Sequence, residues 1–500
     1  MIQYSGSAPT GPTAALLGLA LLPLLVLELA FYAILSLALL LYFAYPGHRE
    51  KISQKAPAAN ETLDRLRAAR QSGDPSRLSK LLQEVLTPDL AGALGDEALG
   101  DGAEELVDEV CDTLQACSIS SKVTRSLRAS FGESCLFLSG GGMLGMYHIG
   151  TVRRLLQEGL LPNQICGTSV GSIVGAFVAT RTDDELHLEL DSLEEWYRQM
   201  GPVQGPFPVQ YWEVVVRVLW RGYIYDYMNQ YRNQATFVSA GLTFAEAYAR
   251  TGRTFTITCA PVTGGPVVLL NRHTSPNVLI ASAICASSSM PMLVEAVRLL
   301  EKMPDGSVQL VSNCDGNPMG ELMRDGTMLA DSPCDQLEHM LNVRWSIISQ
   351  VNPHVVPFSL PFVLAKRIGQ FSSVYARILT RAEGQLRRFI WSTLHAFQAW
   401  TSFPKQGSWI SQLLFQDYFG NVNIIHYNMR FRDYLRLIKN ETSLEDFRKK
   451  AVAGAACTDE QLPRQRLRHK LEATLGSLEE ATSNVRKTRP RRVAGRRGRA

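Results

Sequence analysis

The sequence predicts an α/β fold: a three-layer α/β/α arrangement with flanking helices and an N-terminal membrane segment. From residue 134 onward, short apolar segments alternate with amphipathic segments of helical period, a pattern typical of a sheet covered on both faces. Glycine-rich turns join these segments at 139–145 and 167–171. A long apolar stretch at 14–45 precedes them and shows no polar face, which favours a membrane segment over a buried core helix.

Size and composition are those of a globular protein with appendages. The chain has 500 residues, of which 46% are hydrophobic and 20% charged. The net charge of +4 is uneven, because eight Lys and Arg lie within 486–499. Nine cysteines are scattered without a CxxC pair, so no cysteine-based zinc site is expected. Scattered thiols fit a body that faces the reducing cytosol.

The apolar stretch at 14–45 is long enough to cross a bilayer, which takes about 20 apolar residues. It carries one acid, Glu28, and Pro23 leaves open a shallow hairpin instead of one tilted span. No Lys or Arg precedes it, which disfavours a secretory signal. The apolar stretch is followed directly by the basic residues His48, Arg49 and Lys51. By the positive-inside rule, we therefore expect the rest of the chain, with its catalytic domain, to face the cytosol.

The alternation of segments divides the chain into five parts. We expect a membrane segment at 1–50, a helical region at 51–133, a catalytic domain at 134–358, a mostly helical extension at 359–459 and a basic disordered tail at 460–500. Within the catalytic domain, strands are predicted at 135–139, 164–167, 255–259, 267–271 and 343–349, and helices at 146–158 and 170–182.

Two further segments could contact lipid. Residues 361–400 have a helical period with six basic residues against one acid, so they form either a membrane-surface helix or an ordinary solvated face. The apolar stretch 206–220 is either a lid or a buried helix.

Gly167-Thr-Ser169-Val-Gly171 is a GxSxG motif. In this motif a serine stands on a tight turn between a strand and a helix, and the flanking glycines leave room for crowded backbone. An apolar segment precedes the motif and a helical one follows, as the turn requires. The sequence therefore predicts Ser169 as a nucleophile, with Gly167 and Gly171 forming its elbow.

A second glycine-rich turn, Gly140-Gly-Gly-Met-Leu-Gly145, follows the first predicted strand and opens a helix. It matches the G-x-G-x-x-G dinucleotide pattern, but the next strand does not end in the acidic residue that binds a ribose. It also lacks the Lys-Ser/Thr of a phosphate-binding loop. Backbone N–H groups that stabilise an oxyanion are the better interpretation. No metal or cofactor is implied.

The residues alone leave several candidates for the base that activates Ser169. His148 is more simply a packed or capping histidine, whereas His354 follows in the order of a Ser-Asp-His triad. An aspartate acting directly on the serine is the other route. Asp-Gly pairs, which turn chemistry alone can explain, begin at Asp305, Asp315 and Asp325.

These motifs resemble those of the patatin-like phospholipases and, within that family, the triacylglycerol lipases of yeast and plants that mobilise oil droplets. The resemblance covers roughly residues 60–450. The similar stretches are Arg67–Asp74, Leu138–Gly150, Gly167–Thr182, Thr243–Arg253, Pro276–Ser288 and Val343–Val355.

The resemblance implies a Ser–Asp dyad on a patatin-type sheet, with Asp325 as the base and Asp315 as the fallback. Thr327 stands where the family has a smaller residue. The resemblance also implies an oxyanion hole in the glycine-rich turn; its candidate residues are Gly140, Gly141, Gly142 and Gly145.

The expected activity is hydrolysis of triacylglycerol through an acyl-enzyme, at a membrane or lipid-droplet monolayer and with no nucleic-acid partner. The endoplasmic reticulum or the lipid droplet is the expected location. A phospholipase A, a lysophospholipase or an acyltransferase with the same dyad is the first alternative. The alternative of another class is a catalytically idle membrane scaffold.

Overall fold

The computed structural model describes residues 57–86, 100–116, 121–192, 220, 223, 228–291, 293–312, 317–353, 355, 416, 418, 420–426 and 443–488. The segments predicted at 14–45, 206–219 and 361–400 lie outside these residues. Within the part that is described, no helix is both long and apolar enough to span a bilayer.

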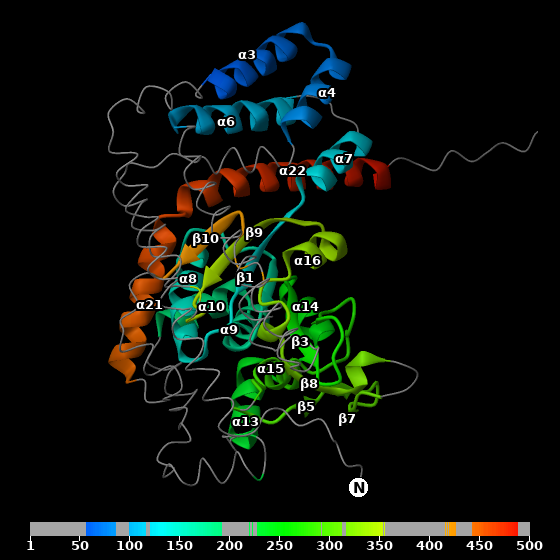
Figure 1. Cartoon of the computed structure of the whole chain (residues 1–500). Helices are drawn as coiled ribbons and strands as arrows, with labels where there is room; N and C mark the ends of the chain where they lie inside the picture. Colours follow the sequence, from blue (N-terminus) through cyan, green and yellow to red (C-terminus); the bar gives the residue numbers. More distant parts are fainter. Residues whose placement is uncertain are drawn as a thin grey trace, which may run out of the picture.

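The strands and helices alternate through the middle of the chain (Figure 1). The strands are β1 Glu133–Leu138, β2 Gln164–Gly167, β3 Thr254–Pro261, β4 Val268–Leu270, β5 Val297–Arg298, β6 Leu300–Lys302, β7 Val308–Leu310, β8 Leu322–Asp325, β9 Val343–Gln350 and β10 Val422–Ile425. The α-helices are α3 Pro57–Ser72, α4 Pro75–Val85, α6 Gly100–Ala116, α7 Ser121–Phe131, α8 Met146–Gln157, α9 Val170–Ala179, α10 Asp183–Asp191, α13 Met228–Val238, α14 Phe244–Thr251, α15 Ile280–Ser287, α16 Cys334–Leu341, α21 Leu444–Asp459 and α22 Leu462–Thr488. Short 3-10 helices are η4 Gly142–Gly145, η5 Pro318–Gly320 and η6 Gly326–Met328.

The central sheet is mixed and has the strand order β10-β9-β1-β2-β3-β8-β5. Strands β10, β9, β1, β2 and β3 are parallel to their neighbours. Strands β4 and β8 pair antiparallel with successive parts of β3. The five strands and two helices predicted for the catalytic domain are confirmed, whereas β5, β8 and β10 were not predicted.

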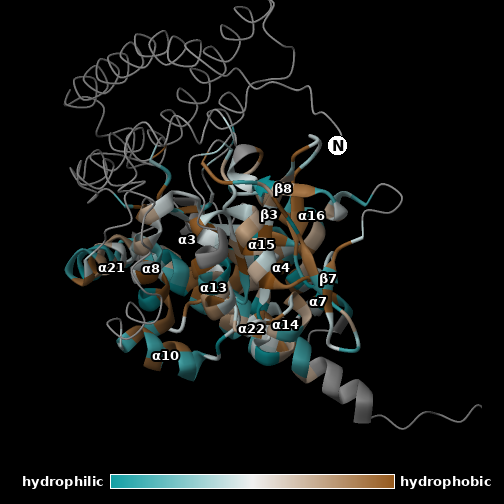
Figure 2. Cartoon of the chain, turned by 90° about the horizontal axis from the view of Figure 1, so that it is seen from below, coloured by the Kyte–Doolittle hydropathy of each residue, from teal (hydrophilic) through white to brown (hydrophobic). Residues whose placement is uncertain are grey.

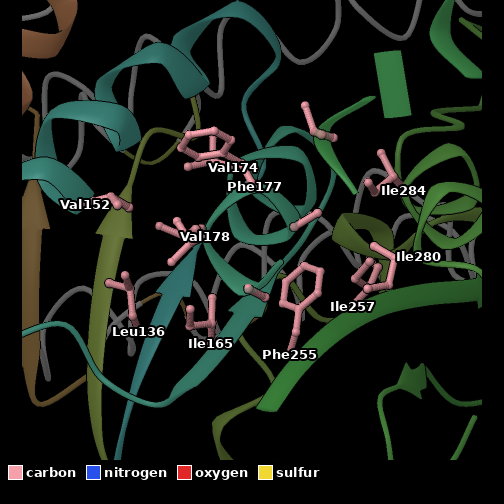
Figure 3. Close-up of a cluster of buried hydrophobic side chains, with 14 of the residues drawn as sticks. Leu136, Val152, Ile165, Val174, Phe177, Val178, Phe255, Ile257, Ile280 and Ile284 are labelled. Carbon is pink, nitrogen blue, oxygen red and sulfur yellow. The ribbon is translucent and has the colours of Figure 1, made fainter. Parts of the chain in front are cut away.

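Helices lie on both faces of this sheet. Along β1, Leu136 and Leu138 belong to the main core beneath α8, α9 and α15, whereas Cys135 and Phe137 point to the other face and join Leu337 of α16. This alternation is the period of two that a strand buried on both faces must show. Figure 3 shows the main core, where side chains from α9 such as Val174 and Val178 meet Leu136 and Ile165.

Helix α8 is fixed by unusually close packing against α21. A side chain at Gly150 would collide with the carbonyl of Ala451, and one at Gly454 would collide with that of Tyr147. These glycines therefore let the two helix backbones touch. Figure 2 shows hydrophilic residues along α10 and α21 at the edge of the molecule and hydrophobic ones at α15 near its centre.

Two boundaries predicted for the C-terminal part are wrong. The sheet does not end with the domain boundary at 358, because β10 extends it beside β9. The tail predicted to be disordered from 460 contains α22, which runs beneath α6 and α7 (Figure 1). Among the charged residues of this segment, four leucines recur at helical spacing and pack against the N-terminal helices. These leucines are Leu467, Leu471, Leu475 and Leu478.

Candidate active site

Ser169 lies on a strained turn between β2 and α9. Its φ and ψ angles are 53° and −123°, a region that residues other than glycine rarely adopt. The turn is fixed by hydrogen bonds from the Ser169 N–H to the Ser287 hydroxyl at 2.9 Å and from the Ser172 hydroxyl to the Ser169 carbonyl at 2.6 Å. Strain of this kind is typical of a nucleophile elbow, a turn that holds a serine hydroxyl clear of the sheet.

The two glycines of the motif are required by the tightness of this turn. A Cβ on Gly167 would collide with the carbonyl of Gly171, and a Cβ on Gly171 would collide with that of Leu138. In both cases the obstacle is backbone, which cannot move aside as a flexible side chain could. The backbone contacts at both positions therefore require glycine, which is compatible with the elbow predicted from the sequence.

Strand β8 runs in the opposite direction to β2 and β3, and its last residue, Asp325, lies at the same level of the sheet as Ser169. Gly167 on β2 is in register with Ile257 on β3, and two residues further along β3 Cys259 is in register with Asp325. Because β8 is antiparallel to β3, it ends where Ser169 begins the turn. The Ser169 hydroxyl lies close enough to the Asp325 carboxyl to lower its pKa by hydrogen bonding.

The Asp325 carboxyl is almost completely buried, with 1% of the residue exposed. Burial raises its pKa to about 6, and the Thr327 N–H together with the nearby hydroxyls of Thr327 and Ser169 opposes this rise by favouring the ionised form. The Thr327 N–H donates to Asp325 Oδ1 at 2.8 Å. A carboxylate with a pKa this close to neutrality can act as a general base and then return the proton.

The glycine-rich turn lies directly against the nucleophile. The space that a Cβ on Gly140 would take is 3.4 Å from Ser169 Cβ and 2.6 Å from the Thr327 hydroxyl. Gly141 and Gly142 have φ angles of 155° and 55°. Among the hydrogen bonds of the described residues, the N–H groups of these two glycines have no acceptor.

The structure separates the four glycines that were predicted to form the oxyanion hole. The Gly140 N–H donates to Asp331 Oδ1 at 2.8 Å, so it is already occupied. Gly145 faces α9, where a Cβ would collide with Val170. Gly141 and Gly142 therefore remain as the donors that could stabilise an oxyanion, and Gly140 and Gly145 allow the turn to approach its neighbours.

A second buried carboxylate, Asp331, was not predicted from the sequence. It lies six residues after Asp325, and only 2% of the residue is exposed. Burial raises its pKa to about 7; repulsion from Asp325 adds to the rise, and hydrogen bonds from Gly140 and Asn352 oppose it. No contiguous motif marks it, because its partners come from distant segments.

The other candidate bases are not at the nucleophile, where the structure describes them. Asp305 is exposed in the turn of the β6–β7 hairpin, and its carboxylate accepts the Ser307 N–H at 2.9 Å. His148 is buried with Nε2 3.0 Å from the Ser139 carbonyl and Nδ1 2.8 Å from the Ser349 hydroxyl. Both ring nitrogens of His148 are thus engaged, and burial lowers its pKa to about 4. Asp315 and His354 lie outside the described residues.

In the described part of the chain, no group of three or more His, Cys, Asp or Glu side chains is arranged so that it could hold a metal ion. All seven described cysteines are free.

Comparison with known proteins covers the same part of the chain. The family model described as patatin-like phospholipase matches residues 136–337, which include Ser169, Asp325 and both glycine-rich turns. A patatin-like phospholipase domain-containing protein of Aspergillus niger is 36% identical over 313 residues, which cover 59% of this chain and 40% of the relative. A protein of the same description from Yarrowia lipolytica is 36% identical over 263 residues, covering 51% and 30% of the two chains.

The chain thus spans less than half the length of these curated relatives. Among solved structures, VipD from Legionella pneumophila aligns with a TM-score of 0.25 and 12% identity over 44% of this chain and 49% of that one. The family model and the curated relatives thus show a patatin-like phospholipase domain over residues 136–337 of this chain.

Proposed function

We propose that this chain is a serine hydrolase of lipid acyl esters and that triacylglycerol is its preferred substrate. The observation that carries the proposal is the meeting of Ser169, on its strained turn, with the buried carboxyl of Asp325. A serine hydroxyl is a weak nucleophile until a neighbouring base accepts its proton. Among the described residues, Asp325 is the base in hydrogen-bonding reach.

The reaction would proceed in two halves. Asp325 accepts the proton of Ser169 as the hydroxyl oxygen attacks the acyl carbonyl, and the N–H groups of Gly141 and Gly142 stabilise the oxyanion. The tetrahedral intermediate collapses, the proton passes from Asp325 to the leaving alcohol, and the acyl group stays on Ser169. Water then attacks the acyl-enzyme with Asp325 as base and releases the fatty acid.

The preference for triacylglycerol rests on the resemblance of the motifs to oil-droplet lipases and on the apolar stretch at 14–45. That stretch would hold the body at a membrane or droplet monolayer, facing the cytosol. A phospholipid or lysophospholipid would use the same dyad, and another alcohol could replace water as the acyl acceptor.

The test compares the full chain with Ser169→Ala and Asp325→Asn on emulsified triacylglycerol and on phospholipid vesicles. Fatty-acid release from triacylglycerol that both variants lose supports the proposal. Serine-dependent release mainly from vesicles would retain the dyad and overturn the substrate. If a fluorophosphonate probe does not label the parent and neither substrate is cleaved, the catalytic proposal fails and an idle scaffold takes its place.

A further inference from the structure

One buried carboxylate near the nucleophile, that of Asp331, has no step in the proposed mechanism. Asp331 follows η6 and precedes α16, and it bonds to four separate segments. Its Oδ1 accepts the Gly140 N–H at 2.8 Å, and its Oδ2 accepts the Asn352 side-chain amide at 2.9 Å. Its carbonyl accepts the Thr168 hydroxyl at 2.8 Å, and its N–H donates to Gln416 Oε1 at 2.6 Å.

These bonds join the parts from which the site is built. Gly140 opens the glycine-rich turn after β1, Thr168 precedes the nucleophile after β2, and Asn352 follows β9. Three adjacent parallel strands, β9, β1 and β2, therefore have their C-terminal ends tied together through one residue. We propose that Asp331 is a positioning residue, whose carboxylate holds the glycine-rich turn so that Gly141 and Gly142 stay directed at the oxyanion on Ser169.

The direction of the bonds explains why a carboxylate stands here. Both of its side-chain partners are N–H donors, so both oxygens must accept, which an ionised carboxylate does and a neutral amide cannot do. The Asp331 carboxylate is almost completely buried, and the Gly140 backbone to which it is hydrogen-bonded lies beside Ser169. The inferred role is thus exerted through the glycine-rich turn and not on the reacting atoms.

The proposal rests on the proposed hydrolase function, but part of its test does not need activity. The first measurement is amide hydrogen exchange of the peptide that spans 139–145, in the parent and in Asp331→Ala. We expect exchange in this peptide to be at least about tenfold faster in the variant, because the Gly140 amide loses its acceptor. Unchanged exchange would overturn the proposal whether or not the parent hydrolyses any ester.

The second measurement is turnover of a soluble p-nitrophenyl ester, expressed per fluorophosphonate-titrated Ser169 so that unfolded molecules do not count. Asp331→Ala should lower kcat about 100-fold with little change in KM, as expected for misplaced oxyanion donors. Asn271→Ala is the matched control, because Asn271 is equally buried but hydrogen-bonds only within its own loop and to Thr256 and Met340. The control should leave kcat per titrated site unchanged.

A reciprocal exchange of the two side chains separates positioning from packing. Asp331→Asn alone presents an N–H group to the Asn352 amide and should lower kcat about tenfold. Adding Asn352→Asp restores a donor facing an acceptor, while the amide oxygen introduced by Asp331→Asn can still accept from the Gly140 N–H. Most of the loss in kcat should therefore be recovered in the double variant.

A kcat for Asp331→Ala within about twofold of the parent, or a double variant that recovers nothing, would contradict the proposal. A parent without esterase activity or probe labelling would instead refute the proposed hydrolase function and leave the amide hydrogen exchange to decide on Asp331.

Discussion

The turn that carries Ser169 and the segment that carries Asp325 are held in different ways. The turn owes its shape mainly to one five-residue motif, in which two glycines permit backbone contacts that no side chain would allow, and a hydrogen bond to Ser287 supports it. The acidic segment is held by partners far along the chain: Asp325 N–H donates to the Ser289 carbonyl at 3.0 Å, and Gln416 Nε2 donates to the Thr327 carbonyl at 2.6 Å. Substitutions in the turn should therefore act through sterics, and those in the acidic segment through charge.

The largest effect is expected where the two regions meet. Ser169→Ala should lower kcat/KM by at least about 1,000-fold, and Asp325→Asn should be nearly as severe. Because the two groups act as a unit, the double variant should be no slower than Ser169→Ala alone. Initial rates on a soluble ester measure this, and fully additive losses would show that the two side chains do not cooperate.

The steric character of the turn is tested by Gly171→Ala. The added Cβ would collide with the Leu138 carbonyl, so we expect the free energy of unfolding to fall by about 3 kcal/mol. Gly476→Ala in α22 is the control, since a Cβ there meets nothing within 4 Å and should stabilise the helix by up to about 1 kcal/mol. Urea denaturation measures both, and equal stability of the two variants would count against a sterically fixed turn.

A substitution that removes the charge of the acidic segment should raise the free energy of unfolding, whereas one in the turn lowers it. The pKa of Asp325 is about 6 in the folded chain and 3.8 ordinarily, so stability present below pH 4 is lost as pH rises through 6. Asp325→Asn removes this loss and should raise the free energy of unfolding by about 3 kcal/mol at pH 8, with no gain at pH 3.5. Asp305→Asn, on an exposed turn, should bring no such gain. A destabilised Asp325→Asn at pH 8 would contradict the burial cost.

The smallest effect concerns the Thr327 hydroxyl, which lies near both buried carboxylates. The Thr327 hydroxyl lowers the pKa of both Asp325 and Asp331. In Thr327→Ala the pKa of Asp325 should rise, and the acid limb of kcat/KM should move to higher pH by about half a unit to one unit. Thr327→Ser retains the hydroxyl and should restore the limb. A shift toward lower pH would mean that the hydroxyl favours the neutral acid.

The same contrast explains how much the sequence could predict. Ser169, Gly167 and Gly171 were predictable because one tight turn between a strand and a helix requires all three within a five-residue motif. Asp325 was placed by resemblance, since β8 has only four residues and no repeating pattern. Asp331 was not predictable, because its partners Gly140, Thr168 and Asn352 converge only through the pairing of β9, β1 and β2. The helix α22 was missed because its charged residues outweigh a leucine stripe that only packing reveals.

The central claim, that Asp325 activates Ser169, is tested most directly by mapping a fluorophosphonate adduct by mass spectrometry. We predict a single adduct on Ser169, formed at a rate that rises through about pH 6 as Asp325 ionises. Asp325→Asn should slow it by at least about 100-fold. An adduct on another residue, or an unchanged labelling rate in Asp325→Asn, would contradict the account.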